Sequence, residues 1–253
     1  MRWLRPVVLA VSFMALAGCH VVQLPDPNAT VGADMHPEIV LRNIRESYRI
    51  MQNRINRGEI TTSQRDELIR TLVEQYAAQV DMDKVPPAKA WQFADILRQA
   101  GRWEDTYKLL QTAVKVAPDD DRFVNDSLQL ARAAAHLGKV DEAIKGCRST
   151  FKVPENQKAP IMMAVLYEVV PEGRGKGKDI ELAKLLEDAI QQHQATIVDA
   201  NSEAGKEFLA GRPHHIQNAW AEIVKLYSSN NRQDLAREAL QRAEKATGSG
   251  ARV

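Results

Sequence analysis

FADILRQAGRWEDTYKLLQTAVKVAPDD, residues 93–120, returns in degenerate form as LARAAAHLGKVDEAIKGCRSTFKVPEN, residues 130–156. Aligning Gly101 with Gly138 gives a period of 138 − 101 = 37 residues. Self-similarity at a fixed period of about 20 to 50 residues is typical of proteins that stack one supersecondary unit several times. The sequence therefore predicts an array of repeated units.

The units are expected to be helical, because apolar residues recur at spacings of three and four from Pro37 onward. One stripe, Val40 to Ile55, begins after a proline, which the first turn of a helix accepts, and ends before Gly58. A second follows the capping signal TTSQ, residues 61–64, and ends before two prolines. We predict an all-α chain in which residues 37–86 form a helical hairpin, either a cap or a degenerate repeat.

Residues 87–156 resemble two tetratricopeptide repeats, a family whose unit is a pair of antiparallel helices of about 34 residues. That family places a small residue in its first helix, a glycine at the turn, an aromatic two residues later, alanines in the second helix and a closing proline. The first unit departs from this pattern at Thr106 and the second at Val140. The matching positions are Ala94, Gly101, Trp103, Ala113 and Pro118, then Ala131, Gly138, Ala143 and Pro154.

Two further units follow along the chain. Residues 217–248 resemble a third tetratricopeptide repeat, in which Asn231 replaces the turn glycine, since asparagine tolerates the left-handed backbone conformation. Residues 157–195 are similar to the Sel1-type variant, with a Gly/Lys-rich turn, GRGKGK, at 173–178. Residues 196–216 are expected to be an irregular or helical connector.

This resemblance implies a right-handed α-α superhelix, a TPR-like helical-repeat solenoid, in which small residues let neighbouring helices share a continuous core. In the family, the first helices line a groove that takes up extended peptides or a helix of another protein. Trp91 is the expected anchor for such a partner, and a solvated helix face is the alternative for most other positions. The groove residues predicted by helical placement are Trp91, Gln92, Asp95, Arg98, Asn125, Leu128, Gln129, Arg132, Asn218, Glu222 and Lys225.

The N-terminus, MRWLRPVVLAVSFMALAGC, has the layout of a secretory signal, with two arginines before an apolar run of residues 6–18 that is too short to span a membrane. LAGC, residues 16–19, resembles the bacterial lipobox. This resemblance implies a lipoprotein signal peptide over residues 1–18 and a covalent diacylglyceryl and N-acyl lipid, such as palmitate, on Cys19. An ordinary cleaved signal or an uncleaved anchor is the alternative.

Residues 19–36 carry prolines and few large apolar side chains, and are expected to be a flexible tether. His20 is not the aspartate that retains lipoproteins at the inner membrane of enteric bacteria, which favours the periplasmic face of the outer membrane. In an organism with one membrane, the site would be the outer face of the cytoplasmic membrane. Loss of residues 1–18 leaves 32 basic against 33 acidic side chains, which argues against nucleic acid as a partner.

Cys147 is then the remaining thiol, so no intramolecular disulfide can form. It lies on the stripe expected to face the core, four residues after Ala143 and four before Phe151. We therefore predict a buried, inert thiol. A reactive cysteine is the alternative and would need a nearby base or helix N-terminus.

The sequence shows no motif for catalysis, metal or cofactor binding. GRGKGK lacks the serine or threonine that completes a P-loop, and His214 and His215 are adjacent residues that point about 100° apart on a helix. We expect a non-enzymatic, membrane-anchored scaffold or assembly factor for an envelope protein or peptide, with no cofactor. The alternative is a module that binds cell-wall glycan or a small anionic ligand through the segment 195–216 and the basic residues Arg174, Lys176 and Lys178 of the turn.

Overall fold

The computed structural model describes residues 36–247, which are helices and their connections with no strand among them. Short 3₁₀ turns lie at Met82–Lys84, Pro87–Lys89, Thr150–Lys152 and Glu155–Gln157, and a π-helical turn, η6, lies at Val165–Val169. The α-helices are α1 Pro37–Asn56, α2 Thr62–Ala78, α3 Ala90–Gln99, α4 Trp103–Lys115, α5 Asp120–His136, α6 Val140–Ser149, α7 Ala159–Ala164, α8 Val170–Gly173, α9 Asp179–Ala195, α10 Glu203–Ser229 and α11 Gln233–Thr247.

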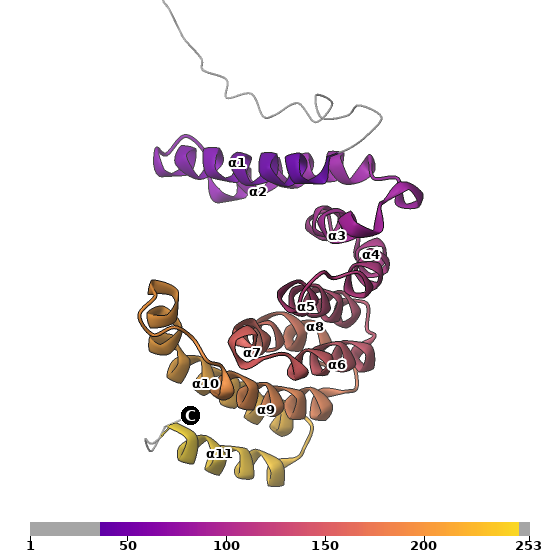
Figure 1. Cartoon of the computed structure of the whole chain (residues 1–253). Helices are drawn as coiled ribbons and strands as arrows, with labels where there is room; N and C mark the ends of the chain where they lie inside the picture. The colour runs from indigo at the N-terminus through magenta and orange to yellow at the C-terminus, as the bar shows by residue number, and fades with distance from the viewer. Residues whose placement is uncertain (1–35, 248–253) are drawn as a thin grey trace, which may run out of the picture.

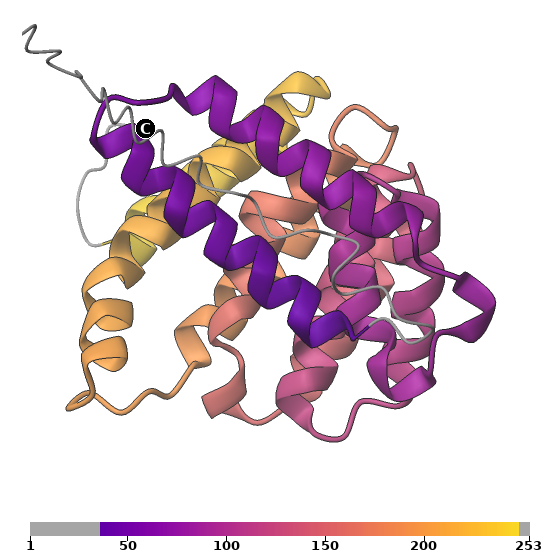
Figure 2. The same ribbon diagram turned by 90° about the horizontal axis from the view of Figure 1, so that it is seen from above.

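The helices pack mainly on neighbours in the chain. The pairs α1 and α2, α3 and α4, α5 and α6, and α10 and α11 are in contact, and α4 joins α5 while α9 joins α10. Figure 1 shows the pairs following one another along an arc from α1 and α2 to α11. Seen from above, α1 and α2 lie across the rest of the stack (Figure 2). The all-α prediction is confirmed.

Three of the turns within pairs contain a residue in the left-handed backbone conformation at the aligned position. Gly101, between α3 and α4, has a φ of 72°, and Gly138, between α5 and α6, has a φ of 78°. Asn231, between α10 and α11, has a φ of 57° and is the one non-glycine residue with positive φ in the described range. L-residues other than asparagine and aspartate rarely adopt this conformation, which explains the residue types at the aligned positions.

The first helical pair follows its predicted signals. The side chain of Thr61 accepts a hydrogen bond from the Gln64 amide while the Gln64 side chain accepts from the Thr61 amide, so the predicted capping box starts α2. Val40, Ile44 and Met51 of the α1 stripe are buried. Tyr48, on the same stripe, is 42 % exposed and faces the groove described below.

The core between pairs contains the small residues expected there. Ala94, Ala131, Ala143 and Ala236 are each buried, which lets adjacent helices approach closely. Cys147 is fully buried, and burial raises the pKa of its thiol to about 12. The prediction of a buried thiol is confirmed, and a thiol with this pKa has almost no thiolate at neutral pH.

The C-terminal half differs from the sequence expectation in one respect. We expected an irregular or helical connector over 196–216 and a separate repeat from 217, whereas a single helix, α10, begins within the connector at Glu203 and continues through Pro213 to Ser229. A proline removes one helical hydrogen bond, here the one to the carbonyl of Leu209. Leu209 is exposed, so water can satisfy that carbonyl and the helix continues.

The predicted signal peptide, Cys19 and most of the tether lie outside the described residues. None of the described helices combines the length and apolar character needed to cross a membrane.

Candidate functional site: a groove across consecutive helical pairs

The first part of the candidate site is a hollow of about 220 Å³ between α3 and α5. Trp91, Asp95 and Arg98 of α3 line one side, and Asn125 and Gln129 of α5 line the other. These five residues were predicted from the sequence to share one surface, and the structure brings them together because both helices are the first members of adjacent pairs.

A second hollow of about 510 Å³ continues from the first between α5 and the segment from Glu155–Gln157 to η6. Asn125 and Gln129 line both hollows, so the two adjoin each other. The lining of this second hollow combines amides with larger side chains of mixed polarity. It contains Leu128, Asn156, Gln157, Pro160, Met163, Tyr167 and Glu168.

A third hollow of about 370 Å³ extends the surface in the other direction, toward α1 and α2. It shares Arg98 with the first hollow and is lined also by Tyr48, Arg70 and Arg132. We refer to these three adjoining hollows as the groove. It runs from an arginine-rich end near α2 to an amide-rich end near α7.

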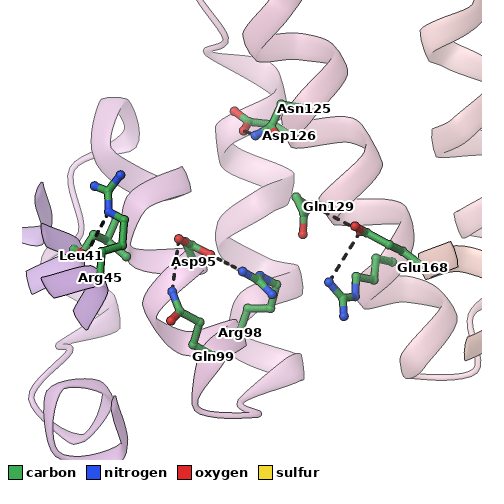
Figure 3. Close-up of polar contacts among 10 residues, drawn as sticks. Leu41, Arg45, Asp95, Arg98, Gln99, Asn125, Asp126, Gln129 and Glu168 are labelled. Carbon is green, nitrogen blue, oxygen red and sulfur yellow. Dashed lines mark hydrogen bonds and ion pairs between the residues drawn. The ribbon is translucent and has the colours of Figure 1, made fainter. Parts of the chain in front are cut away.

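Ion pairs fix the charged side chains of the groove (Figure 3). Arg98 Nη2 donates to Asp95 Oδ1 at 2.5 Å, and Gln99 Nε2 donates to Asp95 Oδ2 at 3.3 Å. On the next pair, Gln129 Nε2 donates to Glu168 Oε2 at 3.4 Å. Arg132 Nη1 lies 3.6 Å from the same oxygen. These contacts hold the side chains in defined positions across α3, α5 and η6.

Some buried polar atoms of the groove have no hydrogen-bond partner within the described part of the chain. They are Gln129 Oε1, Gln157 Oε1 and Arg132 Nε. Leaving such an atom unsatisfied costs about 1–3 kcal/mol. Because each of these atoms is covered by neighbouring side chains, a ligand could reach it only after those side chains move.

Trp91 lies in the groove wall, but one face of its ring is covered. The Arg122 guanidinium carbon lies 3.7 Å from the ring centroid, and Arg122 also forms an ion pair with Asp126. Burial raises the pKa of Asp126, while the positive charge of Arg122 opposes that effect. This packing fixes the indole as part of the groove wall.

The remaining predicted residues lie elsewhere. Gln92 is half-buried and lines none of the three hollows. Asn218 and Lys225 line a separate hollow of about 510 Å³ on α10. Glu222 forms ion pairs with Arg174 and Lys225. Asn218 still reaches the groove, since its Nδ2 donates to the Tyr167 hydroxyl at 3.1 Å.

Sequence reasoning missed the wall formed by Met163, Tyr167 and Glu168. The stretch PIMMAVLYEVV, residues 160–170, reads as an apolar run without a clear exposed stripe. The π-helical turn η6 adds a residue per turn and shifts the helical phase, so regular helical placement assigns the wrong face after it. Tyr167 is 50 % exposed. The one signal for this in the sequence is its hydroxyl, which needs a hydrogen-bond partner or water.

The basic turn GRGKGK is engaged within the protein. Lys176 Nζ donates to the carbonyls of Ala135 and His136 at 2.8 and 2.9 Å. Lys178 pairs with Asp141 at 3.0 Å, and Arg174 pairs with Glu222. Within residues 36–247, no three histidine, cysteine, aspartate or glutamate side chains are grouped so as to hold a metal ion.

No family model matches this chain, and no curated protein or solved structure matches it either.

Proposed function

We propose that this protein is a non-enzymatic scaffold whose groove binds an extended segment of an envelope protein. The observation that carries the proposal is the row of adjoining hollows along α3, α5 and η6, in which Asn125 and Gln129 line two successive hollows. A right-handed superhelix of TPR-like and Sel1-like pairs, expected from the repeats, is the architecture in which first helices line such a surface.

The polar atoms of the groove favour an extended segment over a helix. A helix satisfies its own backbone groups, whereas an extended chain presents N–H and C=O groups along its length. Asn125 and Asn156 line the groove with exposed amides, which can donate hydrogen bonds to such groups and accept hydrogen bonds from them. Pro160 and Met163 add apolar contact area beside them.

The LAGC motif supports a membrane-anchored version of this function, in which Cys19 carries the lipid and the protein faces the periplasm from the outer membrane. Anchoring raises the local concentration of any partner at the same membrane, so a modest affinity of the groove suffices. The assembly of envelope proteins is the process that fits this combination.

A glycan- or anion-binding function receives no support from the basic turn. Arg174, Lys176 and Lys178 each contact a carboxylate or a backbone carbonyl of the protein. An anionic ligand would compete with these contacts for the same donors.

Co-purification of the tagged full-length protein from gently solubilised membranes tests the scaffold. The groove variant combines Gln129→Leu with Tyr167→Ala, and the control is Val116→Ala, which changes an equally exposed side chain outside the groove. We expect a stoichiometric partner with the wild type and the control, and at least a tenfold weaker association with the groove variant. Undiminished association, with unchanged helical content, would show that the partner binds elsewhere.

A second arm tests the anchor. Cys19→Ala is expected to move the protein from the membrane to the soluble fraction. Retention of this variant in the membrane fraction would contradict lipid anchoring and leave the groove proposal untouched.

A further inference from the structure

A histidine is enclosed where the C-terminal end of α9 meets the first half of α10. His193 is fully buried, and neither of its ring nitrogens has a hydrogen-bond partner among the residues described. Its ring packs on Phe208, with the centroids 4.8 Å apart, and lies 6.1 Å from the ring of His215. Phe208 and His215 both belong to α10.

The charges around His193 disfavour a proton on its ring. Burial lowers the pKa of the ring, and the positive charges of Arg212 and His215, both from α10, lower it further. Carboxylates on two neighbouring parts of the chain are already paired: Glu155 lies 3.9 Å from Lys158, and Asp188 of α9 pairs with Arg148 of α6. A protonated His193 would therefore be a buried cation without an acceptor.

Few contacts hold this part of α10 in place. The Ile197 amide donates to the carbonyl of Glu155 at 3.2 Å, and Phe208 packs on His193. The bond from Arg212 Nη2 to the carbonyl of Thr196, at 2.8 Å, joins the start of the loop to α10. Glu203, Lys206, Glu207 and Leu209 are exposed. Pro213 interrupts the helical hydrogen bonds directly after this segment, which gives α10 a point at which it can bend.

We propose that residues 196–212, the loop and the first half of α10, form a pH-operated flap that is docked while His193 is neutral and turns away about Pro213 when His193 binds a proton. The docked flap touches Glu155, beside the groove residues Asn156 and Gln157. Its effect on a bound partner rests on the proposed function, but the movement does not.

The direction of the pH dependence follows from the two proton affinities. The surroundings lower the pKa of docked His193 to about 4 from its ordinary value of 6.5, which it regains when the flap is open. The open state therefore binds a proton at a higher pH than the docked state, and acidification from pH 6.5 toward pH 4 favours opening. Between pH 7 and pH 5, these two pKa values raise the open-to-docked ratio about 20-fold.

Amide hydrogen exchange of the full chain, measured at pH 7 and pH 5 and corrected for intrinsic exchange rates, tests the flap. We expect the opening equilibrium of residues 203–212 to rise about 20-fold on acidification in the wild type and in the control His214→Gln, which changes an exposed histidine. In His193→Phe, which keeps an apolar ring beside Phe208 and cannot titrate, the rise should be absent.

An equal rise in His193→Phe would overturn the proposal. A nuclear magnetic resonance titration of His193 in the wild type provides an independent readout should that variant fold poorly. A midpoint well below 6.5 is expected, and a midpoint at 6.5 would also overturn the proposal. These measurements use the free protein, so their result is independent of whether a partner binds the groove.

Discussion

Replacement of Gly205 by alanine is expected to weaken the docking of the loop before α10. A Cβ atom at this position would lie 1.9 Å from the carbonyl oxygen of Asp199 and 2.9 Å from the hydroxyl of Ser202. Ordinary contact begins at 3.4 Å, so the backbone must shift by about 3.4 − 1.9 = 1.5 Å. The crowded atom is a backbone carbonyl, which cannot move aside as a side chain does.

Forced shifts of this kind cost about 1–3 kcal/mol. Alanine has a higher helix propensity than glycine by up to about 1 kcal/mol, which offsets part of that cost. We therefore expect Gly205→Ala to lower the free energy of unfolding by about 1–2 kcal/mol. For a protein of this size, that loss lowers the melting temperature by roughly 2–8 °C.

Gly146→Ala provides a matched control, because it makes the same chemical change within a helix. Its Cβ would meet Ala131 Cβ at 3.4 Å and the Ser127 carbonyl at 3.6 Å, which are ordinary contacts. We expect it to be more stable than the wild type by about 0.5–1 kcal/mol.

Thermal unfolding followed by circular dichroism measures both variants, with hydrogen exchange to locate the change near residues 199–205. A Gly205→Ala protein at least as stable as the wild type would refute the reasoning, because the Asp199 carbonyl could not then be packed over the start of α10.

Two further predictions concern the core and the turns. Cys147 is fully buried, and its thiol pKa is raised to about 12. A disulfide-exchange reagent should therefore leave it unmodified in the folded protein at pH 8 and modify it completely in concentrated guanidinium chloride. Fast reaction without denaturant would contradict its burial. Asn231 has a left-handed backbone conformation. In a urea titration, Asn231→Ala should therefore destabilise the protein by about 1 kcal/mol, while Asn231→Gly should be close to neutral. Equal stability of the two variants would contradict the left-handed turn.

Much of the fold could be predicted because its signals are local. The capping box of Thr61 and Gln64 and the left-handed turn residues Gly101, Gly138 and Asn231 act within a few residues of chain. The burial of Cys147 follows from its place on one helical stripe. Each of these features depends on backbone geometry that the residue type itself restricts.

The groove could be predicted only in part, because its shape depends on contacts between segments. Helical placement found Asp95, Arg98, Asn125 and Gln129, which follow regular helical spacing. It could not show that Arg122 covers the ring of Trp91, since their cation-π contact joins different pairs. The π-helical turn at Val165–Val169 and the continuation of α10 through Pro213 are also features that local sequence signals do not predict.

The sequential packing of the helices has a mechanical consequence for a chain held at its N-terminus. The main contacts of α1 and α2 are with each other and with α3, and each later pair is likewise joined mainly to its neighbours. Tension applied through the N-terminus would therefore load one interface at a time instead of shearing the whole core. The stack would peel from α1 inward, and the length of chain released at each step would be set by one helical pair.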